Sequence, residues 1–138
     1  MSCDYRIQGE ATVRNTPEVI QAINDLASDV LNRDSVAVTE THSDALELHI
    51  DYDDITTVHT PGYVGSFLEK ISPAVVGCAV FEIETSGDRW DEWIGEDQAI
   101  KESKSRSALF GIQDMSRDLL PEDLARCLEY LQERERSL

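Results

Sequence analysis

The chain has 138 residues, of which 28 are acidic and 12 basic, giving a formal net charge of −16. This length predicts a single α+β domain over residues 1–138, with a core at 4–95 and a C-terminal helical extension at 105–136. The absence of an apolar run of about 18 residues excludes a membrane-spanning helix, and the charge excludes direct binding to nucleic acid or anionic lipid.

The first two elements are predicted as a strand and a helix. Residues 4–14 alternate between apolar and polar side chains, which is typical of a half-buried strand. Thr16 is a good N-cap, and Pro17 suits the first position of a helix. The helix then runs to about residue 31, and its apolar residues recur every three or four positions: Val19, Ile20, Ile23, Leu26, Ala27, Val30 and Leu31.

A β-hairpin and a second helix are predicted next. Residues 35–41 are rich in β-branched side chains, residues 42–45 form a turn, and the following strand has a buried side made of Leu46, Leu48, Ile50 and Tyr52. The second helix begins with Thr60 as its cap and ends before Pro73, which disfavours helix at the residue that precedes it.

The remaining chain predicts a strand pair and helical material. Residues 75–85 are nearly all apolar at their start and favour a buried strand, and residues 89–95 favour an antiparallel return strand. We expect a loop or a short, poorly packed helix at 96–107 and a short helix at 108–119. A last helix follows Pro121, with Leu124, Leu128 and Leu131 as its apolar stripe.

The predicted order is therefore β-α-β-β-α-β-β followed by helix. Its first six elements match the ferredoxin-like (β-α-β-β-α-β) arrangement, in which two helices cover one face of an antiparallel sheet. We expect an α+β fold of this type, with an added fifth strand and a C-terminal helix or helices. That fold hosts many unrelated functions, so the function has to be inferred from the residues on the surface.

The three cysteines and the N-terminus indicate the compartment. Cys3, Cys78 and Cys127 are widely spaced and odd in number, which favours reduced thiols over a disulfide framework. The first ten residues lack the basic-then-apolar order of a secretory signal. We therefore expect a cytoplasmic protein.

The stretch ELHIDYDD, residues 47–54, offers a candidate metal site. A histidine and a carboxylate two positions apart on a strand share one face, about 7 Å apart, so His49 and Asp51 are possible ligands, with His59 or His42 as a third. The buried side at Leu46 to Tyr52 explains the same alternation by folding alone. A solvated strand face is therefore the favoured interpretation, and a small metal-dependent enzyme using His49, Asp51 and His59 is an alternative.

Other catalytic patterns are weaker still. His42, Ser43 and Asp44 have the residue types of a hydrolase triad, but they are adjacent in a predicted turn, whereas a triad needs separate elements to converge. Glu82 and Glu84 form a possible acid/base pair on a strand, and no glycine-rich phosphate loop is present. We expect no enzyme activity, no cofactor and no bound metal.

The acidic residues are concentrated in one span. Between Arg33 and Lys70 there is no basic residue, although the span holds Asp34, Glu40, Asp44, Glu47, Asp51, Asp53, Asp54 and Glu69. A strand face with a carboxylate about every 7 Å has about half the charge density of one DNA strand, so a mimic of DNA needs further acids from neighbouring segments. The span is either a solubilising surface or a binding surface for a basic partner.

Two tryptophans follow in RWDEW. Trp90 and Trp93 lie on opposite faces if residues 89–94 are a strand, so an exposed tryptophan beside Asp91 and Glu92 resembles an interaction hot spot. The alternative is that both rings pack, one on each side of the hairpin.

In size, charge and lack of catalytic motifs, the chain resembles the small acidic antagonists made by phages and mobile elements, including anti-CRISPR proteins and DNA mimics. It is also similar to immunity proteins that neutralise basic bacterial toxins. The leading hypothesis is a non-enzymatic inhibitor that docks on a basic, nucleic-acid-binding protein, and an immunity protein is the alternative. A homodimer through an open sheet edge is also possible. The expected partner-binding residues are Glu47, Asp51, Asp53, Asp54, Asp91, Glu92 and Trp93.

Overall fold

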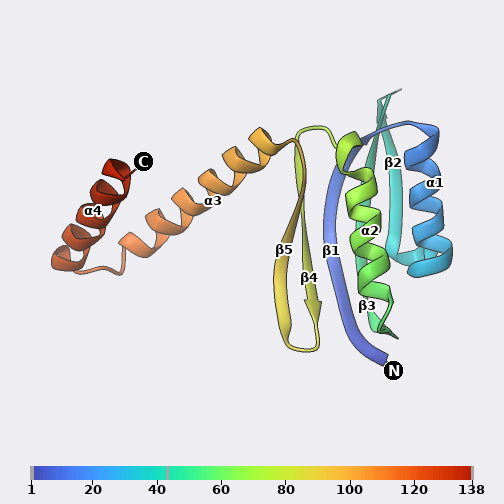
Figure 1. Ribbon diagram of the computed structural model, residues 1–138, viewed down its shortest axis with the longest axis horizontal. Helices are drawn as coiled ribbons and strands as arrows, with labels where there is room; N and C mark the ends of the chain where they lie inside the picture. Colours follow the sequence, from blue (N-terminus) through green and yellow to red (C-terminus); the bar gives the residue numbers. More distant parts are fainter. Residues whose placement is uncertain (1, 43, 138) are drawn as a thin grey trace. The chain divides into compact units, whose positions relative to one another are not determined.

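The computed structural model describes residues 2–42 and 44–137, without the side chain of His42. The chain divides into two compact units, residues 1–101 and 102–138. The first unit contains five strands and two helices: β1 (Ser2–Arg14), α1 (Pro17–Asp25), β2 (Val36–His42), β3 (Ala45–Thr57), α2 (Thr60–Ile71), β4 (Cys78–Thr85) and β5 (Asp88–Gly95) (Figure 1). Two further helices, α3 (Asp97–Ser116) and α4 (Pro121–Arg136), follow.

The five strands form one antiparallel sheet in the order β2-β3-β1-β4-β5. The expected α+β fold with a fifth strand is confirmed at this level. β1 lies in the middle and pairs with β3 along its whole length, from Ser2 opposite Thr57 to Arg14 opposite Ala45. Figure 1 shows α1 and α2 on the same face of the sheet.

The first helix begins as the sequence predicts. The Thr16 hydroxyl accepts a hydrogen bond from the backbone N–H of Val19 at 3.3 Å, and Pro17 occupies the first turn. After Asp25 the helix widens into a π-helical turn, Leu26–Val30, and the N–H of Leu31 donates to the Leu26 carbonyl at 2.8 Å. The predicted helix to residue 31 is therefore α-helical only in its first part.

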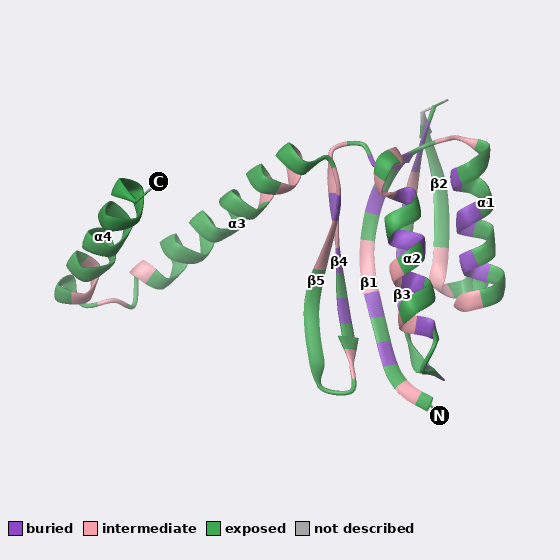
Figure 2. Ribbon diagram, viewed as in Figure 1, coloured by how far each residue is buried: buried purple, intermediate pink, exposed green. Residues whose placement is uncertain are grey.

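The core lies between the sheet and the two helices. Residues at alternate positions of the three central strands are buried there, as Figure 2 shows for β1 and β4. The predicted buried side of β3 is confirmed, since Leu46, Leu48, Ile50 and Tyr52 all belong to the core. α1 contributes Val19, Ala22 and Ile23, and α2 contributes Val64, Phe67, Leu68 and Ile71.

Residues 97–107, expected as part of a loop or a short, poorly packed helix, join residues 108–116 of the next expected helix in one 20-residue helix, α3. Neither α3 nor α4, both of which lie wholly within the described residues, contains a buried residue. The weak apolar pattern concealed the helix because α3 does not depend on burying a face in the core of the first unit. Among the described residues, no helix has the length and apolar character needed to cross a membrane.

Gly9 allows the central strands to approach the Phe81 ring closely. A Cβ atom at Gly9 would lie 2.6 Å from Phe81 Cδ1 and 2.7 Å from the Val80 carbonyl oxygen, in the plane of the β1–β4 pairing. Phe81 is fully buried, so neither the ring nor the strand has room to move. The glycine is therefore required by packing.

We predict that Gly9→Ala lowers the free energy of unfolding by about 1 to 3 kcal/mol, because the added methyl overpacks the core. Gly65→Ala is the matched control: no atom lies within 4 Å of its Cβ position in α2, so the better helix former should stabilise by about 0.5 to 1 kcal/mol. Urea denaturation of both variants measures this, and equal effects in the two would contradict the packing at Gly9.

Candidate functional site

The candidate site is the face of the sheet opposite α1 and α2, which we call the open face. Successive side chains of a strand point to opposite faces, so the residues between the core positions lie here. They are Ala37 and Thr39 of β2; Glu47, His49, Asp51, Asp53 and Ile55 of β3; Asp4, Arg6, Gln8, Glu10, Thr12 and Arg14 of β1; Val80, Glu82 and Glu84 of β4; and Arg89, Asp91 and Trp93 of β5.

Four of these residues form an acidic row across the sheet. Gln8 of β1 pairs with Asp51 of β3 on one side and with Glu82 of β4 on the other, and Glu82 pairs in turn with Asp91 of β5. The three carboxylates are exposed. Because directly paired like charges in a sheet repel, the Glu82–Asp91 pair raises the energy of the free protein. We call Asp51, Gln8, Glu82 and Asp91 the acidic row.

The next row alternates in sign. Arg6 of β1 pairs with Asp53 of β3 and with Glu84 of β4, and Glu84 pairs with Arg89 of β5. Arg89 also reaches diagonally to Glu82 in an exposed ion pair of 3.9 Å, a contact that contributes little in water. Asp53 therefore has a basic neighbour, Arg6, that the local sequence of residues 34–69 does not contain.

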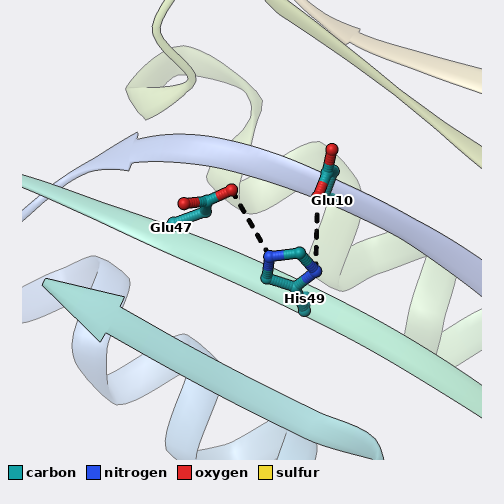
Figure 3. A group of neighbouring side chains, drawn as sticks. All are labelled: Glu10, Glu47 and His49. Carbon is teal, nitrogen blue, oxygen red and sulfur yellow. Dashed lines mark ion pairs between the residues drawn. The ribbon is translucent and has the colours of Figure 1, made fainter. Parts of the chain in front are cut away.

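A third group surrounds His49, which lies beside Glu10 and Glu47 (Figure 3). Its Nδ1 lies 3.3 Å from a Glu10 carboxylate oxygen and its Nε2 lies 3.4 Å from Glu47. One donor atom from each of the three side chains lies within 4.8 Å of the others. Glu10 escaped the sequence prediction because it comes from β1, which becomes the neighbour of β3 only through the sheet pairing.

The hypothetical ligands His49, Asp51 and His59 are not brought together. His59 lies beyond the end of β3, immediately before α2, and eight residues of strand separate His49 from Thr57, which is about 26 Å of extended chain. Asp51 faces Gln8 instead of joining the His49 group. A single ion cannot contact the three predicted ligands.

The predicted partner-binding residues divide between the two faces. Glu47, Asp51, Asp53, Asp91 and Trp93 lie on the open face. Asp54 pairs with the buried Tyr5, and Glu92 pairs with the buried Phe81, so both belong to the helix side of the sheet. The prediction from the sequence grouped Asp54 and Glu92 with their neighbours because it treated adjacent acids as one patch and did not assign each residue to a face of the sheet.

The tryptophans lie on opposite faces, as predicted. Trp93 pairs with Val80 on the open face and is half-buried, whereas Trp90 pairs with Ile83 on the helix side and is 40% exposed. Trp93 therefore supplies an aromatic edge beside the acidic row.

The other catalytic candidates do not form a site. Ser43 and the side chain of His42 lie outside the described residues, and Asp44 is exposed in the turn. Glu82 and Glu84 both lie on the open face, but in different rows, opposite Gln8 and Arg6 respectively.

A shallow hollow of about 640 Å³ lies on the open face around the acidic row. Gln8, Glu10, His49, Asp51, Cys78, Val80 and Glu82 are among the residues that line it. The carboxylates of Glu10, Asp51 and Glu82 around this hollow can receive an ammonium or guanidinium group, because a cation there is attracted to all three.

No family model, curated protein or solved structure matches the chain. Functional inference therefore rests on the geometry and charge of the described residues.

On the helix side of the sheet, in contrast to the open face, a titratable side chain, Tyr5, is buried. Its ring is 1% exposed and packs 6.3 Å from the Tyr52 ring. Burial raises the pKa of the Tyr5 hydroxyl well above its ordinary value, and the nearby Cys3 and Glu92 raise it further. Burial likewise raises the pKa of Tyr52, with Asp54 adding to the effect.

We predict that alkaline pH destabilises the fold through Tyr5. Because its pKa is higher in the folded than in the unfolded chain, where it is about 10, the unfolded state loses the proton first. Below about pH 10 the Tyr5 hydroxyl is protonated in both states and does not change the free energy of unfolding. Above about pH 10 the hydroxyl ionises first in the unfolded chain, and the free energy of unfolding should fall. Tyr5→Phe should make this fall shallower in urea titrations between pH 8 and pH 11.

Tyr63→Phe is the control for this experiment, since it removes a tyrosyl hydroxyl from a side chain that is exposed on α2. Identical pH slopes in the wild type and Tyr5→Phe would show that the buried hydroxyl is not the cause.

Proposed function

We propose that this protein is a non-enzymatic binding protein whose open face docks on a basic surface of another protein, and that this surface is one that binds nucleic acid. The observation that supports the proposal most strongly is the acidic row. Asp51, Glu82 and Asp91 stand on three strands, with the neutral Gln8 between Asp51 and Glu82. The row itself contains no basic side chain, and the arginines that reach it from the next row do so in exposed contacts, Arg6 to Gln8 Oε1 at 3.1 Å and Arg89 to Glu82 at 3.9 Å.

The spacing of the carboxylates suits this role. Neighbouring strands are about 4.8 Å apart and one DNA strand carries a charge about every 3.4 Å of its axis, so Glu82 and Asp91 are spaced a little more widely than those charges, while Asp51 lies about two strands away from Glu82. Residues in the next row are about 7 Å further along the strands. A lysine- or arginine-rich surface that holds phosphates therefore finds carboxylates at similar intervals.

The free energy of docking has an electrostatic origin in this proposal. Residues 1–101 hold 20 of the 28 acids and six of the 12 bases, so the unit has a formal charge of −14. Such a field accelerates encounter with a basic partner and weakens as salt rises. Trp93, half-buried at the edge of the row, adds an apolar contact of the kind that anchors interfaces.

Inhibition follows from this geometry. A partner whose cationic groups are neutralised by the open face has fewer cations left for phosphates. The action is competitive with nucleic acid and needs no reaction, which agrees with the separation of the candidate catalytic residues. This is the chemistry expected of an antagonist of a nucleic-acid-binding protein.

We also propose that residues 2–85 have the ferredoxin-like arrangement expected from the sequence. The order β-α-β-β-α-β and the place of β1 between β3 and β4 support it. β5 then extends the sheet beside β4 and supplies Asp91 and Trp93 to the open face.

We predict that Asp51→Lys combined with Glu82→Lys weakens binding of a fluorescent 12-residue arginine-rich peptide by at least about tenfold at low salt, because two carboxylates next to Gln8 become cations. Fluorescence anisotropy measures the affinity. Raising the salt concentration should reduce the difference between the variant and the wild type.

Asp54→Lys combined with Glu69→Lys is the matched control, since it changes the net charge by the same amount on the helix side of the sheet. We expect the control to retain affinity within about threefold. Equal losses in both double variants would mean that only total charge matters and would contradict docking through the open face.

A further inference from the structure

The second unit, residues 102–138, exposes an apolar surface out of proportion to its size. Eight of the 15 large apolar side chains that are exposed in the described chain belong to it: Leu109, Phe110, Ile112, Met115, Leu120, Leu128, Tyr130 and Leu131. Figure 2 shows no buried residue along α3 or α4. Single exposed apolar residues are ordinary, but a contiguous set of this kind marks an interaction surface.

Four of these eight side chains, Ile112, Met115, Tyr130 and Leu131, line a groove of about 390 Å³ between the two helices. The groove is lined by Ile112, Met115, Ser116, Leu119, Leu124, Arg126, Cys127, Tyr130 and Leu131. On α4 the apolar residues Leu124, Cys127, Leu128 and Leu131 follow the three- and four-residue spacing of one helical stripe. Leu124, Cys127 and Leu131 form the α4 wall of the groove, and Leu128 extends that wall outward. We call these four residues the α4 stripe.

The second unit needs a covering surface. α4 has 16 residues, and isolated helices of about 12 to 15 residues are marginal in water even with favourable sequences. Units of fewer than about 40 residues usually need oligomerisation, metals or disulfides to be stable. Burial of the α4 stripe against another chain supplies what the unit lacks.

The charge of the second unit indicates what kind of chain can cover the α4 stripe. Residues 102–138 carry eight acids and six bases, so the second unit is nearly neutral while the first is strongly negative. A basic partner would be drawn to the open face of the first unit, whereas two copies of the second unit, each with a formal charge of −2, repel one another only weakly. The near-neutral stripe therefore favours self-association.

The charged residues beside the α4 stripe are arranged for an antiparallel pair. At 100° per residue, Asp123 and Arg134 are 11 positions apart and lie along the same edge of the stripe. They stand at about equal distances on either side of Leu128. If two α4 helices pack antiparallel about a two-fold axis near Leu128, Asp123 of each chain faces Arg134 of the other.

We propose that the protein is a homodimer in which α4 packs antiparallel on α4 of a second copy. The α4 stripes bury each other, and two symmetric Asp123–Arg134 pairs fix the direction. In the described chain Asp123 pairs with Arg126 at 3.7 Å, and an exposed pair of this kind contributes little in water, so it can give way to a contact with Arg134 of the other chain. The dimer presents two open faces to a basic partner and does not depend on the proposed docking.

Sedimentation velocity on the full chain tests the proposal. The wild type should sediment as a dimer of the 15.5 kDa chain at micromolar concentration, and Leu128→Glu should be monomeric because it places a charge at the centre of the stripe. A wild type that is still monomeric at about 100 μM would have a dissociation constant far above that of a stable homodimer. That result would overturn the proposal.

Charge exchange tests the direction of packing without disturbing the apolar stripe. Asp123→Arg and Arg134→Asp should each weaken the dimer about five- to tenfold, because two like-charged contacts replace two ion pairs. The double variant should recover the wild-type dissociation constant within about threefold. Failure of the double variant to recover would exclude antiparallel pairing of these residues.

Glu129→Arg provides the control for charge reversal on the solvent side of α4, opposite the stripe, and should leave dimerisation unchanged. Chemical cross-linking gives an independent readout: in a variant with Cys3 and Cys78 changed to serine, a short bismaleimide should join two chains through the exposed Cys127. Monomeric product alone would contradict the α4–α4 contact.

Discussion

The register of β1 against β3 and β4 determines both faces of the sheet. A shift of one residue in a strand sends every side chain to the opposite face. The register is held by burial of Ile7 and Val13 in the core and by the close contact between Gly9 and the Phe81 ring. The same register places Gln8 between the carboxylates of β3 and β4 on the open face.

Much of the fold was predictable from local signals. Alternation identified β1 and β3, and the Thr16–Pro17 pair marked the start of α1. These signals work because burial of one strand face and capping of a helix are set by neighbouring residues. The continuous helix α3 was not predicted because none of its residues is buried, and so it lacks the periodic pattern that burial imposes.

The site was predictable only in part, because charge on a sheet is a property of neighbouring strands. The absence of bases between Arg33 and Lys70 suggested an uncompensated acidic span, but β1 supplies Arg6 beside Asp53. Conversely, Glu82 and Asp91 join Asp51 in one row although about 30 to 40 positions separate them from it in sequence. The order of charges across strands decides where the proposed basic partner would be held most strongly.

The two units differ in physical character. The first has a packed core and a strongly charged face, while the second has exposed apolar helices that are nearly neutral. A charged face favours rapid, salt-sensitive encounter, and an apolar stripe favours lasting association. The formal net charge of −16 therefore comes almost entirely from the first unit, which carries −14.

The most direct measurement is a ¹H–¹⁵N spectrum of the labelled protein titrated with the arginine-rich peptide. Docking on the open face predicts that the largest shift changes occur at Gln8, Asp51, Glu82 and Asp91, and that they disappear at high salt. Shift changes centred on the exposed acids of α1, such as Glu18 and Asp25, would contradict the account.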